Sequence, residues 1–147
     1  MMTSHLKNIF RLSSLSVACL FLVTCDNSVV MESSQTVVGE KWDYSDFKFF
    51  TAEIKDTVQH YNIYLSVRHG FNFEWRNLWV KIETTFPGGK SFEKRVNLVL
   101  SEPDGKWFGD CLGDNCDILI PIQENAYFPE VGKYTFKIVL SNSVFKF

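Results

Sequence analysis

The chain has 147 residues, a formal net charge of −2 and an aromatic content of 16%, including 14 phenylalanines. That length suits one domain with a real hydrophobic core, and the near-neutral charge excludes a broad electrostatic attraction to nucleic acid or anionic surfaces. Aromatic side chains favour the half-buried surfaces of sheets, so the composition predicts a β-rich fold.

The N-terminus has the pattern of a lipoprotein signal peptide over residues 1–24. Lys7 and Arg11 precede an apolar run at 12–23, which has secretory length and is shorter than the roughly 20 apolar residues that span a bilayer. The run ends at the sequence LVTC, which is typical of a lipobox, where a thioether joins diacylglycerol to the cysteine. We therefore expect Cys25 to be lipidated and to anchor the chain in the cell envelope, with the outer membrane as the expected location.

Two alternatives to this interpretation stay open. The segment is compatible with an uncleaved anchor, or with an ordinary signal peptide in which Cys25 is incidental. Cys19 is a second possible lipidation site, although it would leave a very short hydrophobic region before it.

Residues 25–40 are expected to form the lipidated cysteine and a flexible tether. The stretch is polar and Ser-rich and has no sustained period. Fully extended, 15 such residues reach at most about 50 Å, so the domain would stand clear of the lipid headgroups.

Period-two alternation dominates residues 41–147 and predicts one domain built of strands. Tyr61, Ile63 and Leu65, for example, alternate with polar side chains, and turn sequences rich in Gly, Pro and Asp separate the runs. Many short strands, each with one apolar face, predict an all-β fold, an antiparallel β-sandwich of jelly-roll or immunoglobulin-like type. Pro121 indicates an edge position for its strand. We expect strands at about 46–54, 60–68, 78–83, 92–100, 118–122 and 134–140.

Cys111 and Cys116 flank a tight loop and are candidates for a disulfide, which is the default for such a pair outside the cytoplasm. Free thiols are the main alternative. A metal site would need more soft ligands at matching spacing, so no metal is expected there.

The other polar residues give little sign of catalysis. His60 and His69 are the only histidines after the signal, and neither belongs to an acid–base or triad motif. We expect no catalytic residue, no enzyme activity and no cofactor. We interpret five carboxylates near the cysteines as polar turn residues. A calcium site is the alternative, although their spacing matches no known calcium loop. They are Glu102, Asp104, Asp110, Asp114 and Asp117.

Four aromatic residues crowd one stretch of the chain, namely Phe71, Phe73, Trp75 and Trp79. Exposed rings there would stack on a glycan or dock a protein partner. Buried rings would instead form core at one end of the sandwich, which is the commoner role of aromatics in β-proteins. The sequence leaves both interpretations open.

The order and spacing of these elements resemble the gliding-motility lipoprotein GldH family of Bacteroidota. The resemblance covers about residues 40–140, together with the lipobox. The matching elements are Trp42 with Phe47, Tyr61-x-Ile-x-Leu-x-Val-Arg68, Phe73 near Asn77-Leu-Trp79, Asp104-Gly-x-Trp107-x-Gly109, Phe128-Pro129 and Gly132-x-Tyr134-x-Phe136.

The resemblance implies a non-catalytic envelope lipoprotein of gliding or of the linked type IX secretion machinery, with other envelope proteins as partners. The cysteine pair looks like an addition to the family pattern. The chain also stops at 143–147, where the resemblance implies a further turn and a closing strand, so we expect unpaired backbone along 134–140. The rival interpretation is a membrane-tethered β-sandwich module that binds glycans.

Overall fold

The computed structural model describes residues 29–142. The predicted signal peptide, Cys25 and residues 143–147 lie outside this described range. Within it, no helix has the length and apolar character needed to cross a membrane.

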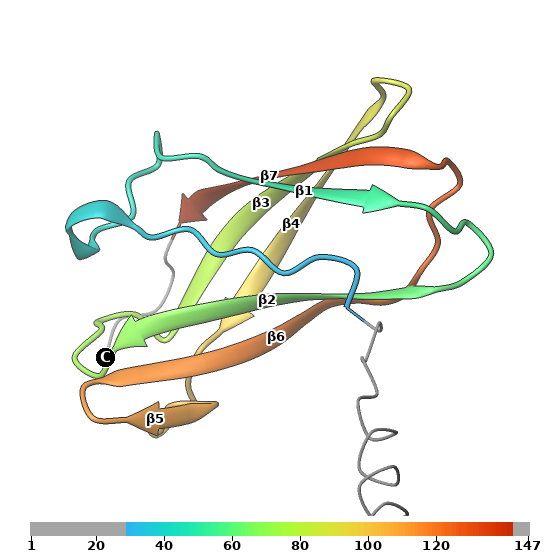
Figure 1. The fold of residues 1–147 in the computed structure, drawn as a ribbon. Helices are drawn as coiled ribbons and strands as arrows, with labels where there is room; N and C mark the ends of the chain where they lie inside the picture. The colour runs from blue at the N-terminus through green and yellow to red at the C-terminus, as the bar shows by residue number, and fades with distance from the viewer. Residues whose placement is uncertain (1–28, 143–147) are drawn as a thin grey trace, which may run out of the picture.

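In the described part of the chain, seven strands form two antiparallel sheets that pack face to face (Figure 1). One sheet has four strands in the order β1-β7-β3-β4, and the other has three in the order β2-β6-β5. This arrangement confirms the predicted all-β antiparallel sandwich. The strands are β1 (Lys48–Ile54), β2 (Tyr61–Gly70), β3 (Asn77–Thr85), β4 (Ser91–Val99), β5 (Asp110–Leu112), β6 (Asn115–Ala126) and β7 (Gly132–Asn142).

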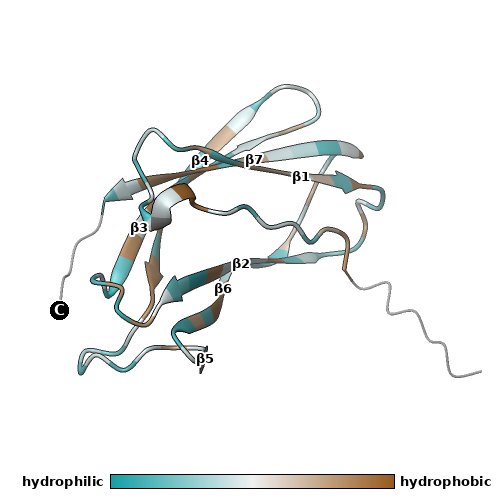
Figure 2. Cartoon of the chain, turned by 60° about the vertical axis from the view of Figure 1, so that its left-hand side comes forward, coloured by the Kyte–Doolittle hydropathy of each residue, from teal (hydrophilic) through white to brown (hydrophobic). Residues whose placement is uncertain are grey.

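The period-two pattern of the strands places their apolar side chains between the sheets. Along β3, Leu78, Val80 and Ile82 are buried, whereas Trp79 and Lys81 on the opposite face are only half-buried. Colouring by hydropathy shows the same banding along several strands (Figure 2). The main core also includes buried residues from both sheets, namely Leu98, Leu100, Ile118, Ile138 and Leu140.

Strand β7 is a central strand, which corrects the expectation of unpaired backbone along 134–140. It pairs with β1 on one side, where Phe50 lies opposite Phe136. On its other side it pairs with β3, where Ile82 lies opposite Ile138. Both sheet partners are antiparallel. They flank β7 on both sides over residues 135–138, and at least one of them pairs with each remaining residue of 134–140.

Residues 29–37 run beside the sandwich between β1 and β2 in both views of the fold (Figures 1 and 2). The Gln35 side-chain amide donates to the carbonyl of Phe49, and Lys48 Nζ donates to the Thr36 carbonyl at 3.0 Å. A short 3-10 turn, Val38–Glu40, then leads to β1. The described part of the expected free tether is therefore attached to the domain.

Strand β6 has an open edge over most of its length. Its partner β5 has only three residues and pairs only with residues 115–117 of β6. Pro121 lies beyond that pairing, as its lack of a backbone N–H predicts. Among the described residues, β4 is likewise the last strand of its sheet on this side of the molecule.

Candidate interaction site

The structure does not gather the four predicted aromatic residues onto one surface. Phe73 and Trp75 pack against the main core. Trp79 lies on the outer face of β3, with the Arg95 guanidinium 5.4 Å from its ring centroid. Phe71 is 60% exposed just after β2. Two of the four rings are therefore core, and the other two belong to different elements.

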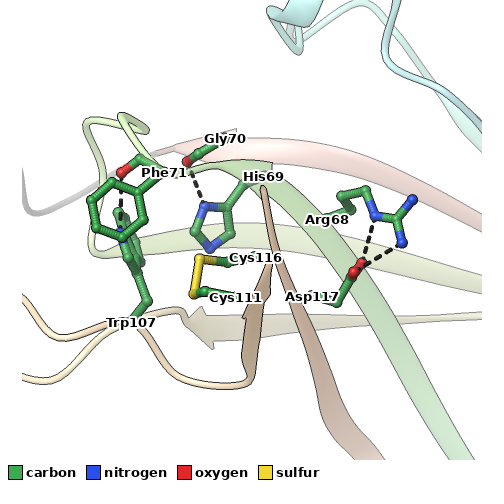
Figure 3. The surroundings of a disulfide bond; sticks show 8 residues. All are labelled: Arg68, His69, Gly70, Phe71, Trp107, Cys111, Cys116 and Asp117. Atoms are coloured by element: carbon green, nitrogen blue, oxygen red, sulfur yellow. Dashed lines mark hydrogen bonds and ion pairs between the residues drawn. A yellow bond between two sulfur atoms is a disulfide. The ribbon is translucent and has the colours of Figure 1, made fainter. Parts of the chain in front are cut away.

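His69, Phe73 and Trp107 pack together at the end of β2. The His69 ring is buried, 4.3 Å from the Trp107 ring and 5.5 Å from the Phe73 ring between centroids. Its Nδ1 donates to the Gly70 carbonyl at 2.9 Å, and Trp107 Nε1 donates to the Phe71 carbonyl at 3.1 Å (Figure 3). His69 thus has a local packing role, whereas His60, just before β2, is exposed.

Cys111 and Cys116 form a disulfide that joins β5 to β6 beside the His69 ring (Figure 3). The two residues lie opposite each other in the strand register, with their Cα atoms 4.0 Å apart. Cys116 is fully buried and Cys111 is exposed. The bond therefore fastens the short outer strand to the core end of β6.

Arg68 and Asp117 form a bidentate ion pair on the outer face of the three-stranded sheet. Arg68 Nε donates to one Asp117 carboxylate oxygen at 2.7 Å, and its Nη2 donates to the other at 2.8 Å. These hydrogen bonds lower the pKa of Asp117 from its usual value near 3.8 and raise the pKa of Arg68.

The lowered pKa of Asp117 predicts a measurable acid sensitivity. The ion pair contributes fully to stability at pH values well above the ordinary aspartate pKa, and the contribution disappears as the pH falls through the lowered pKa of the folded state. We expect the melting temperature to fall less steeply below pH 4 in Asp117→Asn than in the native chain, measured between pH 2 and pH 6. Arg68→Gln should flatten the profile in the same way, and an unchanged slope in both variants would contradict the assignment.

Two of the other four carboxylates, Asp104 and Glu102, make turn and ion-pair contacts. Asp104 accepts a hydrogen bond from the Lys106 backbone N–H at 3.1 Å, and Glu102 lies 3.6 Å from Lys106 Nζ. Over the part of the chain that the structure describes, no three His, Cys, Asp or Glu side chains are placed to hold a metal ion. These contacts are what polar turn residues would make.

A groove of about 540 Å³ opens along the uncovered edge of β6, on the side where β4 ends. Its apolar rim includes Val99, Phe108 and Leu119, which are 45%, 38% and 63% exposed. Gly109 and Asp110 close one end, and Pro121 lies toward the other. The groove therefore combines exposed apolar side chains with an unpaired strand edge.

Gly109 brings the loop before β5 directly against β6. Its φ is +79°, and a Cβ atom built there would lie 2.1 Å from the Asp117 carbonyl oxygen. Only glycine fits so close an approach. In the sequence, Gly109 stands out only as the last residue of Asp104-Gly-x-Trp107-x-Gly109, and no local pattern predicts its contact with β6.

The described residues thus define a small antiparallel β-sandwich with an open strand edge and an adjoining groove. The model of the GldH lipoprotein family matches residues 29–141, so the chain belongs to that family. Membership makes it a lipid-anchored protein of the cell envelope.

Two relatives have names that refer to gliding. The "gliding motility lipoprotein GldH homolog" of Christiangramia forsetii is 25% identical over 115 residues, covering 78% of this chain and 70% of the relative. The "gliding motility lipoprotein GldH" of Flavobacterium johnsoniae is 24% identical over 120 residues, covering 82% of this chain and 74% of the relative. No solved structure matches the chain.

Proposed function

We propose that the protein is a non-catalytic interaction component of the gliding machinery or of the secretion machinery linked to it. A lipid on Cys25 would hold it at the outer membrane, and its sandwich would bind other envelope proteins. Two acyl chains or more give stable attachment to a membrane, which suits a protein that works at one surface.

The observation that carries this proposal is the open edge of β6 with its groove, in a chain of the GldH family. Exposed sheet edges are templates for pairing with another chain, and natural proteins usually shield them. An edge left open beside exposed Phe108 and Leu119 is therefore a good surface for a protein partner.

The glycan-binding alternative loses its main support. It needs a platform of exposed rings, but Phe73 and Trp75 pack against the core. Phe71 and Trp79 come from different elements, and the Trp79 ring already has Arg95 above it. A protein partner at a strand edge is the better explanation of the exposed surface.

Labelling with a palmitate analogue in the native host tests the anchor. We expect Cys25→Ser to lose the label and to leave the membrane fraction, because the lipid is attached through the cysteine sulfur. Cys19→Ser is the matched control and should stay labelled. Label that persists in Cys25→Ser and vanishes in Cys19→Ser would move the anchor to the earlier cysteine.

Deletion of the gene in the host, followed by complementation, tests the functional role. We expect the deletion to impair colony spreading or the export of surface proteins, and the native chain to restore it. Cys25→Ser should fail to restore it although the folded domain is present. Normal spreading and normal export in the deletion strain would contradict the proposal.

A further inference from the structure

The open edge of β6 presents a defined row of backbone groups. The 4.0 Å spacing of the Cys111 and Cys116 Cα atoms is typical of a pair that shares no backbone hydrogen bonds. Asp117, one residue further along β6, therefore directs its N–H and C=O toward β5. The register of β6 against β2 shifts between Pro121 and Gln123, so regular alternation extends only to Pro121. Within it, Leu119 directs its N–H and C=O to the same side as Asp117, where β5 has ended. Pro121 adds a carbonyl there but no N–H.

Apolar side chains line the approach to this edge. Leu119 and Phe108 stand at the groove, and Val99 contributes from the end of β4. A groove beside an unpaired strand edge suits one extended chain, whose backbone would pair with β6 and whose alternate side chains would contact these residues. A helix would leave the polar groups of the edge unpaired.

The opposite side of the same sandwich already holds an extended segment. Residues 29–37 run between β1 and β2, and the chain there bonds to edge strand β1 through Gln35 and Thr36 (Figure 1). The corresponding side between β4 and β6 has no such segment among the described residues. The fold therefore contains its own example of an extended chain beside its sheet edges.

The charge at one end of the groove specifies the occupant further. Asp110 lies directly opposite Asp117 in the strand register, and like charges in that position repel each other. Arg68 neutralises Asp117, whereas no described lysine or arginine is ion-paired with Asp110. A basic side chain arriving at this end would pair with Asp110.

We propose that an extended segment of an envelope partner protein, with alternating apolar residues and at least one Lys or Arg, adds as a strand to β6 at residues 119–121. This inference rests on the proposed interaction function and specifies its binding surface. The partner is identified by its chemistry, an extended basic and apolar peptide, and the pairing is through the backbone of β6.

Photocrosslinking of the full chain in its native host tests the proposal. A photoreactive phenylalanine derivative is placed at Val99, and the adduct is measured with three residues at position 119: the native leucine, Leu119→Val and Leu119→Pro. Leu119→Val keeps the backbone N–H and should preserve the adduct. Leu119→Pro removes that donor from the open edge and should lower the yield about tenfold. Resistance to protease reports whether each variant is folded.

A charge reversal provides a second arm that does not depend on the proline. Asp110→Lys should lower the adduct yield about tenfold, whereas Asp104→Lys, in the preceding turn, should leave it unchanged. If Leu119→Pro proves sensitive to protease, the comparison of Asp110→Lys with Asp104→Lys tests the proposal by itself. Sequencing of the crosslinked peptide should find Lys or Arg near the attachment point.

Several results would overturn the inference. One is an undiminished adduct yield in Leu119→Pro or Asp110→Lys when that variant is folded. The others are crosslinking to a second copy of this chain and crosslinking to lipid alone. A photoreactive residue at Val58, which is 84% exposed in another loop, separates the two levels of proposal. Envelope-protein adducts from Val58 without any from Val99 would end this inference and leave the interaction function standing. No protein adduct from either position would count against both.

Discussion

Replacing Gly109 with alanine is expected to lower the free energy of unfolding by about 3–4 kcal/mol. The backbone φ of +79° is unfavourable for any residue with a Cβ, and the added atom would meet the Asp117 carbonyl oxygen at 2.1 Å. That oxygen belongs to the backbone of β6, so relief requires the whole loop to move away. Urea unfolding followed by tryptophan fluorescence measures the loss.

Gly113→Ala is the matched control. This glycine also has a positive φ, +61°, but a Cβ there would meet no atom within 4 Å. We expect a loss of only about 1 kcal/mol, from backbone conformation alone. Equal losses in the two variants would show that the close approach of Gly109 to β6 is unimportant.

Replacing Tyr134 with alanine is expected to cost about 4 kcal/mol. The side chain is fully buried, and its ring packs edge-on against Phe128 at 4.7 Å and Phe86 at 5.3 Å between centroids. Its hydroxyl donates to the Glu130 carbonyl at 2.9 Å and accepts from the Glu130 N–H at 3.2 Å. Alanine removes the ring contacts and both hydrogen bonds and leaves a cavity.

Tyr134→Phe separates these contributions. It keeps the ring and removes only the hydroxyl, so we expect a loss of about 1–2 kcal/mol from the unpaired backbone groups of Glu130. Tyr127→Phe, on a side chain that is 61% exposed, should change stability by no more than about 0.5 kcal/mol. A loss for Tyr134→Ala as small as that of Tyr127→Phe would contradict the burial of this ring.

Strands with a strong local pattern were predictable from the sequence. Alternation predicted 60–68 and 78–83, and the structure has β2 at Tyr61–Gly70 and β3 at Asn77–Thr85. For β6 the pattern predicted only 118–122, because polar residues occupy both ends of a strand that covers Asn115–Ala126. Strand β5 was missed, since three residues carry no period and its pairing depends on the turn and the disulfide that follow.

The candidate site was predictable only in part. Phe71, Phe73, Trp75 and Trp79 have the same parity, so alternation assigns them to one face. The chain turns after β2, where the Phe73 N–H donates to the Gly70 carbonyl at 3.0 Å, and parity is lost across that turn. The Arg68–Asp117 pair joins residues 49 positions apart, and the groove beside β6 is lined by four separate segments of the chain between Ser66 and Pro121. Such contacts are fixed by strand register, which no local pattern specifies.

The attachment of residues 29–37 to β1 limits how far the domain can stand from its anchor. With Cys25 acylated as proposed, the chain from Cys25 to Gln35, the first described residue bonded to β1, is ten residue steps long and extends at most about 36 Å. Opening the two side-chain bonds at Phe49 and Thr36 would release seven more residues, to core-packed Trp42, and add about 25 Å. A force transmitted through the lipid anchor would therefore break these weak, exposed hydrogen bonds first. The tether would lengthen before the force acted on any strand of the sandwich.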